Sequence, residues 1–396
     1  MLDFLFFCFF GVFIGALAGL LPGLHPNQLY FLLFSLSFAL EPDSFIVFVA
    51  SLATSNLAFS YIPTLFLSLP DANTVANILP AHKLVLKGRG FEALTISLIS
   101  LLLVSIIIFA LLPTFYIVLP FVQKTTKPFV HVFLFTLVLI MIFTEKGIGR
   151  VYAALLFLIS GVLGLVTLNS KFLSYDKVLF CVLTGLFGLP GLIFSSKGLM
   201  PKQDTREASV KINFKSIVLG ILGGLVSGVL PGAGESQVGL LLSLISKADD
   251  ESILSSLASI NMANMLLAVL MLVTTNKIRS GLAECLAVTE IKEYILLFFG
   301  AVLFSVGVSS IFCFFFAKSF LAFIEKIDYK KLSRAIIFVI TIMVILFTGL
   351  WGLFLVFIST ALGILPILLN VKRTSNMGFL ILPTLLFYSQ VNLFVF

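Results

Sequence analysis

Long, unbroken apolar segments recur along the whole chain, and they restrict its fold more than any other feature. A helix needs about 20 apolar residues to cross a bilayer, whereas the strands of a membrane barrel alternate apolar and polar residues. The segments here are continuous; 60% of all residues are hydrophobic and 11% are charged. Soluble domains carry roughly twice that share of charge. We therefore predict an all-α polytopic protein of the cell membrane, and exclude a soluble enzyme, a disordered chain and a nucleic-acid-binding domain.

A polar linker at residues 197–215 divides the apolar segments into two sets of seven. We predict an N-terminal membrane repeat at residues 1–196 and a C-terminal membrane repeat at residues 216–396. The apolar segments of the two sets are 4–20, 24–40, 44–62, 91–119, 128–144, 150–168 and 178–194, and then 216–230, 236–246, 252–275, 294–324, 335–348, 350–369 and 378–394.

Three local matches in the same order indicate that the two halves arose by internal duplication. Residues 22–28 (PGLHPNQ) correspond to residues 231–237 (PGAGESQ), and each element follows a glycine-rich segment. Residues 52–58 (LATSNLA) correspond to residues 257–263 (LASINMA), which equates Asn56 with Asn261. A polar, basic loop comes next in both halves. Many membrane transporters are built from such repeats.

Segment count and charge together predict the orientation of the repeats. An odd number of crossings per half, seven or five with a re-entrant hairpin, gives inverted repeats. Two spans in each of the segments 91–119 and 294–324 would make the repeats parallel instead. On the odd count, 18 of the 25 Lys and Arg residues fall on one side of the membrane. Because positive loops stay in the cytoplasm, we expect a cytoplasmic linker and both termini outside.

The paired Pro-Gly elements are the strongest candidates for a functional site. A break at membrane depth is tolerated only inside protein or along a cavity. The helix that restarts after a break presents free N–H groups and a positive dipole end, which suit an anion. We therefore predict broken or re-entrant hairpins that bind a small anionic substrate, with ordinary interfacial turns as the alternative. The candidate substrate-binding residues in these elements are Pro22, Gly23, Asn27, Gln28, Pro231, Gly232, Gly234, Ser236 and Gln237.

Two titratable side chains in the same elements, His25 and Glu235, are candidates for binding a coupling H+ or Na+. Burial raises the pKa of a carboxylate, and histidine titrates near neutrality; a position at a wet rim is the alternative. Asn56 and Asn261 lie inside apolar segments, where an amide must find a partner in the bundle or a cavity. These asparagines either bind substrate or join helices.

Three cations in one polar loop, Lys83, Lys87 and Arg89, allow two interpretations. They could steer an anion or bind lipid head groups, or they could anchor the loop at the membrane surface. The four cysteines lack the spacing of a metal site, and we expect inert thiols. We predict no metal and no cofactor.

Short motifs in both halves carry a family resemblance. They are residues 19–23 (GLLPG), 69–71 (LPD), 79–83 (LPAHK) and 87–94 (KGRGFEAL), and then 228–234 (GVLPGAG), 261–264 (NMAN) and 279–281 (RSG). In this order they resemble the TctA family, the large membrane subunit of tripartite tricarboxylate transporters. The likeness extends from about Gly11 to Gly281 and looks most like the shorter archaeal branch.

The resemblance implies cation-coupled uptake of citrate-like carboxylates, with an extracytoplasmic binding protein and a small membrane subunit as partners. It adds Pro70, Asp71, Asn73 and Asn264 to the residues expected along the substrate path. The chain departs from the family pattern at His25-Pro26, where a second glycine-rich step is usual, and at Asp71, where glycine is usual. An acid is unfavourable beside a tricarboxylate, so the substrate stays open.

The leading hypothesis is a secondary active transporter permease for a small organic anion, driven by H+ or Na+, with alternating access between two inverted repeats. The alternatives are a translocase for a polyprenyl phosphate and a scaffold without transport activity. We see no nucleotide-binding motif and no hydrolytic constellation, and we expect neither an enzyme nor an ATP-driven pump. Membrane lipids and a second copy in a homodimer complete the expected partners, and nucleic acid is excluded.

Overall fold

The computed structural model describes residues 2–21, 37, 39–67, 78–126, 129–170, 172–195, 202–205, 210–229, 235, 238–239, 242, 248–324 and 329–389. Within these residues the secondary structure is helical, with no strand. Eight of the described helices are long and apolar enough to cross a membrane, or nine if one bent pair forms a single span. The prediction of an all-α polytopic membrane protein is confirmed.

The helix boundaries follow the predicted apolar segments closely. The first half contains α1 (Leu2–Leu20), α3 (Pro42–Leu67), α4 (Ile78–Leu86), α5 (Gly90–Ala110), α6 (Leu112–Thr126), α7 (Val130–Phe143), α8 (Gly149–Leu168), α9 (Tyr175–Leu183), the π-helix η4 (Thr184–Gly188) and α10 (Leu189–Ser195). The second half contains α11 (Phe214–Val229), α13 (Asp250–Thr275), α14 (Gly281–Leu286), α15 (Ile295–Ile324), α16 (Tyr329–Leu368), the 3-10 helix η5 (Arg373–Met377) and α17 (Gly378–Tyr388).

The two longest predicted segments have different structures, one broken into two helices and the other a single helix. Segment 91–119 breaks at Leu111 between α5 and α6, just before Pro113, which has no N–H to continue the helical ladder. Segment 294–324 forms the single helix α15. One further break divides α16, where Gly349 adopts a positive φ of 66° that favours glycine.

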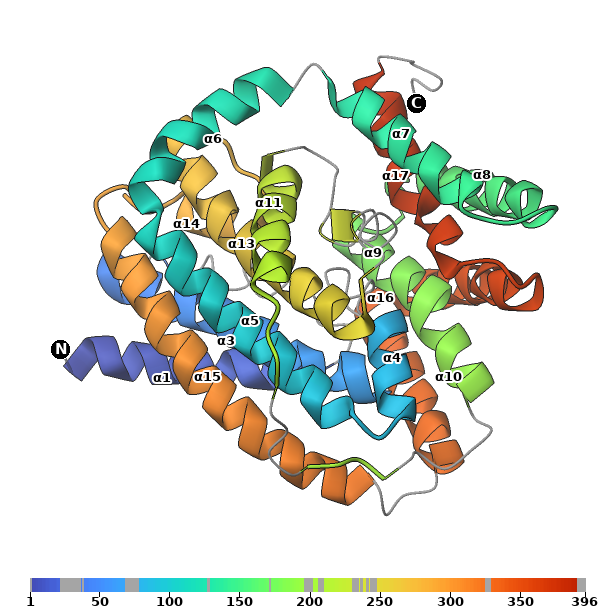
Figure 1. Ribbon diagram of the computed structural model, residues 1–396, viewed down its shortest axis with the longest axis horizontal. Coiled ribbons are helices and arrows are strands. Elements are labelled where there is room, and N and C mark those ends of the chain that lie inside the picture. Colours follow the sequence, from blue (N-terminus) through green and yellow to red (C-terminus); the bar gives the residue numbers. More distant parts are fainter. Residues whose placement is uncertain are drawn as a thin grey trace.

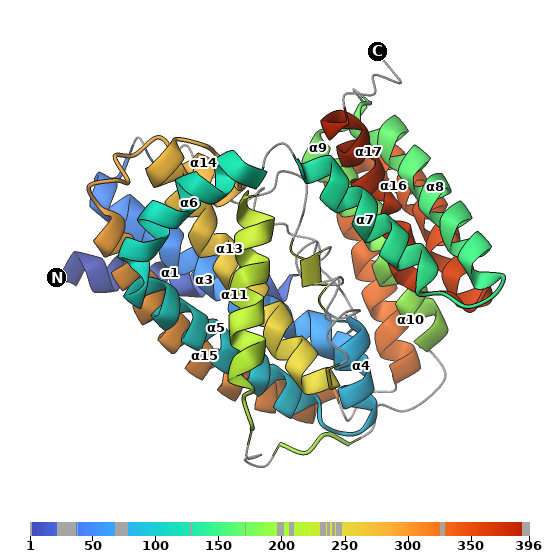
Figure 2. The same cartoon turned by 45° about the horizontal axis from the view of Figure 1, so that its top comes forward.

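The described helices form two groups that lie side by side in Figure 2. The larger helix group contains α1, α3–α6, α11 and α13–α15 around one apolar core. The smaller helix group contains α7–α10, η4, α16, η5 and α17 around two further clusters. Each group therefore takes helices from both sides of the linker, so the halves of the sequence interleave in space (Figure 1).

Glycines let α1 pack closely along α3. A Cβ atom at Gly11 would lie 2.5 Å from the carbonyl oxygen of Phe48, and a Cβ atom at Gly15 would collide with the carbonyl oxygen of Leu52. Gly19 repeats the contact one step further on, against Asn56 and Phe59. Because later glycines meet later residues, α1 and α3 run parallel. This glycine face is the close helix-packing device that membrane helices use.

The pair α11 and α13 has the same geometry. Gly220 meets Ser256 and Ser259, and Gly224 meets Ala263 and the backbone nitrogen of Asn264. The backbone nitrogen of Asn56 holds the corresponding position against Gly15. Packing therefore pairs Asn56 with Asn264, one helical turn beyond the Asn261 that the sequence match equated with it. The reason is that close glycine contacts, not the similarity of neighbouring residues, fix the register of two helices.

Helix α1 ends before the C-terminal end of its partner α3, and α11 ends before the C-terminal end of its partner α13. Gly19 is level with Ser60, and α3 continues over residues 61–67, about 10 Å further at 1.5 Å per residue. Gly228 is level with Ala268, and α13 continues over residues 269–275, again about 10 Å. The two helices thus stop at equal depths relative to α3 and α13.

In the smaller helix group, a glycine of each half of the chain packs against a serine of the other half. A Cβ atom at Gly185 of η4 would lie 2.5 Å from Cβ of Ser359 in α16, and Gly378 of α17 meets Ser160 of α8 in the same way. Each helix in these pairs contacts a helix from the other half of the chain. Such matching contacts are what an internal duplication would produce.

The linker contributes a short docked segment. The amide oxygen of Gln203 accepts a hydrogen bond from Gly90 N at 2.8 Å, and its amide nitrogen donates to Val85 O at 3.0 Å. The backbone nitrogen of Asp204 donates to Gly88 O at 2.9 Å. Residues 202–205 therefore fasten to the turn between α4 and α5.

Candidate functional site

Many of the predicted site residues lie outside the residues that the structure describes. The described candidates are Asn56, Glu235, Asn261 and Asn264. The others, for which the predicted roles remain predictions, are Pro22, Gly23, His25, Asn27, Gln28, Pro70, Asp71, Asn73, Pro231, Gly232, Gly234, Ser236 and Gln237.

Glu235 and Asn264 form the centre of the candidate site. The Asn264 side-chain nitrogen donates a hydrogen bond of 2.5 Å to the Glu235 carboxylate. The Asn264 amide oxygen accepts from the Ser227 hydroxyl at 3.3 Å. Gly228 leaves room beside this amide, because a Cβ atom there would approach its oxygen to 3.3 Å. The end of α11 and the middle of α13 thus hold a carboxylate by a charge-assisted hydrogen bond.

This site lies where the two helix groups meet. Val238, three residues after Glu235, is buried in the core of the smaller helix group, and Val226 and Leu242 pack against the same core. Gly239 touches Leu257 of α13 in the larger helix group. The chain around Glu235 therefore contacts both groups, and a relative movement of the groups would alter the surroundings of its carboxylate.

The other two asparagines are buried, Asn261 one helical turn before Asn264 and Asn56 in α3. Asn261 is 4% exposed and donates a hydrogen bond of 3.0 Å to the hydroxyl of Tyr61, which is fully buried in α3. Asn56 is 3% exposed, and its backbone atoms meet Gly15 and Gly19. The sequence did not single out Tyr61 or Ser227. A hydroxyl inside an apolar segment was the available signal for both residues, but it is common in membrane helices.

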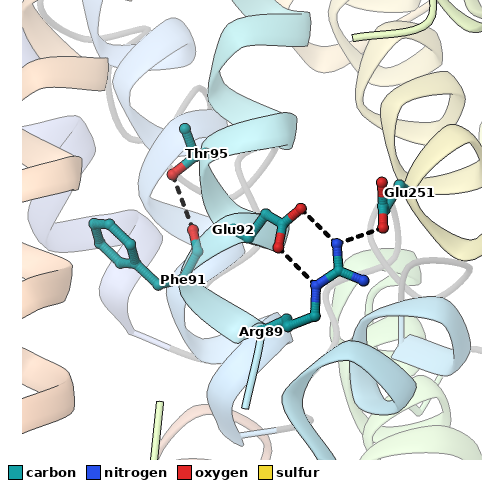
Figure 3. Close-up of polar contacts among 5 residues, drawn as sticks. All are labelled: Arg89, Phe91, Glu92, Thr95 and Glu251. Carbon is teal, nitrogen blue, oxygen red and sulfur yellow. Dashed lines mark hydrogen bonds and ion pairs between the residues drawn. The ribbon is translucent and has the colours of Figure 1, made fainter. Parts of the chain in front are cut away.

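Arg89 and Lys83 are both paired with carboxylates, and Figure 3 shows the contacts of Arg89. The Arg89 guanidinium donates to both oxygens of Glu92, at 2.7 and 2.6 Å, and to Glu251 at 2.5 Å. Lys83 lies 3.0 Å from Asp250. These contacts join the turn between α4 and α5 to the first turn of α13 and raise the pKa of Arg89. Arg89 and Lys83 are therefore held by carboxylates of α5 and α13, and the two interpretations of this loop, anion steering and anchoring at the membrane surface, remain predictions.

We expect Arg89→Gln to lower the thermal stability of the purified protein. Glu92, whose side chain is 13% exposed, and Glu251 would lose their cation. The cost should be about 1–2 kcal/mol, because Arg89 is itself 40% exposed and partly screened. Unfolding would be followed by intrinsic fluorescence in detergent, with the exposed Lys87→Gln as the matched control. Equal stability of the two variants would contradict a structural role for Arg89.

The matched family decides the identity of the chain. Residues 5–378 match the family described as "Tripartite tricarboxylate transporter TctA family". The chain belongs to the TctA family. A protein of Methanocaldococcus jannaschii that is itself described as uncharacterized is 28% identical over 379 residues, which cover 89% of this chain and 92% of that protein. No solved structure matches the chain.

Membership of the TctA family places the chain among the membrane components of transporters, which are not enzymes. Together with the candidate spans it identifies a multi-pass membrane protein. The matched region contains every residue of the site described above. The family match thus confirms the family resemblance that the short motifs indicated.

Proposed function

We propose that this TctA-family chain is the permease of a secondary active transporter for a small organic anion of the carboxylate class. Coupling to H+ or Na+ takes place at Glu235. The observation that carries the proposal is the Glu235–Asn264 pair at the boundary of the two helix groups.

The depth at which α1 and α11 end supports a substrate site inside the membrane. Both helices stop about 10 Å before the ends of their partners. Backbone that leaves a helix at this depth must be satisfied by protein or by a water-filled cavity. Breaks in corresponding places of two halves are the arrangement found around transporter sites. The residues after Leu20 and Val229 are those that the sequence predicts to bind the anion.

Glu235 suits a coupling role because its surroundings can change with its charge. A carboxylate that holds Asn264 can release this amide when it binds a proton or Na+. The released amide nitrogen then becomes a donor for a substrate carboxylate. Binding of cation and anion would thereby favour each other, as coupled transport requires.

Alternating access would arise from movement of the smaller helix group against the larger one. Each group contains matching helices from both halves, and the glycine contacts within each group are too close for sliding. Motion at the boundary between the groups costs less than motion within them. We propose that the halves form inverted repeats and that the partners are a small membrane subunit and an extracytoplasmic binding protein.

A ligand screen by thermal shift tests this function directly. The purified chain would be heated in detergent with di- and tricarboxylates or a short polyprenyl phosphate, with and without Na+, at two pH values. A carboxylate that binds the folded state should raise the midpoint with the logarithm of its concentration once this exceeds Kd, and Asn264→Ala should remove the shift. Stabilisation by polyprenyl phosphate alone would favour the lipid-carrier translocase instead.

A further inference from the structure

Arg279 is a half-buried cation at the far end of α13 from Arg89. It lies in the loop that follows α13, about 16 Å of helix beyond Asn264. Its Nε atom is buried and has no hydrogen-bond partner. No carboxylate among the described residues pairs with it, whereas Arg89 at the other end of the same helix holds two. A buried donor without a partner is costly, so such a group calls for an explanation.

The guanidinium also spans the boundary between the two helix groups. It lies close enough to the Tyr388 hydroxyl, at the end of α17, for its charge to act on that side chain. Tyr388 packs against the core of the smaller helix group, while α13 belongs to the core of the larger group. Arg279 and the Glu235–Asn264 pair therefore lie on one boundary, separated along the length of α13.

We infer that Arg279 is an outer binding residue for the carboxylate substrate. Its guanidinium, whose Nε–H has no partner, donates to a substrate carboxylate at the boundary before the anion reaches Asn264. A guanidinium offers a planar fork that matches two carboxylate oxygens, and an unneutralised one is the natural partner for an arriving anion. Tyr388 is the neighbour of the guanidinium on the side of the smaller helix group. This inference rests on the proposed function and assigns it a second residue.

Uptake by the full chain in liposomes tests the inference, with citrate, succinate and malate as probes. Arg279→Gln should raise KM for the best probe by about 10- to 100-fold, the loss expected for one charge-assisted contact, with the maximal rate nearly unchanged. Arg279→Lys should fall between, since it keeps the charge and loses the fork. Lys277→Gln, an exposed cation of the same loop, should match the wild type.

The outcomes distinguish a role of Arg279 in substrate binding from a purely structural role in joining the two helix groups. The thermal midpoint of Arg279→Gln without ligand checks that the variant is folded. If it is not folded, the KM of Arg279→Lys is compared with that of the wild type instead. Tyr388→Phe should leave KM unchanged or lower it. An unchanged KM in Arg279→Gln, or a fall in maximal rate shared equally with Tyr388→Phe, overturns the inference alone. If the wild type neither binds nor transports any probe, both proposals fail.

Discussion

Glu235→Gln is expected to abolish gradient-driven accumulation of substrate while leaving the protein folded. Glutamine has the shape and the neutral charge of the protonated side chain and can accept only a weaker hydrogen bond from Asn264, and the remaining packing of α11 on α13 should keep the protein folded. Glutamine cannot exchange a proton or neutralise Na+. Coupled uptake should therefore fall by roughly tenfold or more, which is the scale of losing one charged contact.

Uptake into liposomes under an imposed H+ or Na+ gradient measures this effect, and exchange of labelled for unlabelled substrate supplies the contrast. Exchange needs no net coupling, so it should survive in Glu235→Gln more fully than accumulation does. Glu284→Gln replaces an exposed carboxylate in the first turn of α14 and serves as the matched control. Normal accumulation by Glu235→Gln would place the coupling site elsewhere.

The second large effect concerns folding and should appear in Gly15→Val. A Cβ atom at Gly15 would collide with the carbonyl oxygen of Leu52 and lie 2.9 Å from Cβ of Ser55. The partner atoms belong to α3, whose residues 45–66 are all buried and have no room to move away. Overpacking of this kind costs about 1–3 kcal/mol for a modest insertion and more where backbone is the obstacle. We expect little monodisperse protein after size-exclusion chromatography.

Alanine substitutions at other glycines of the chain test the packing argument, because they should lower the thermal midpoint at tightly packed positions and not at open ones. Gly224 meets Ala263 and Asn264 as closely as Gly15 meets its partners, so Gly15→Ala and Gly224→Ala should both lower the thermal midpoint. Gly300 and Gly307 of α15 have open space where a Cβ atom would be. Alanine there should leave the midpoint unchanged or raise it, because glycine inside a helix costs about 0.5–1 kcal/mol. Equal effects at all four positions would refute the packing argument.

The sequence by itself determined the class of fold and most of the helices. In a bilayer a helix satisfies its own backbone hydrogen bonds, so an apolar segment of sufficient length needs no distant partner to become a helix. For this reason the predicted segments agree with α1, α3, α8, α13 and α15, and the ordered short motifs of both halves sufficed to indicate the family. Glu235 was predicted as a site residue because it is a titratable group in a Pro-Gly element, and Asn264 was added by the family resemblance.

Only the tertiary structure decided which helices and side chains meet. Local similarity paired Asn56 with Asn261, but the glycine contacts pair it with Asn264. Arg89 looked like a free cation because its partner Glu251 lies 162 residues away in sequence. The linker suggested two separate halves, whereas the helices interleave into two groups. Such pairings depend on surface shape and on hydrogen bonds between distant segments, and neither leaves a local pattern in the chain.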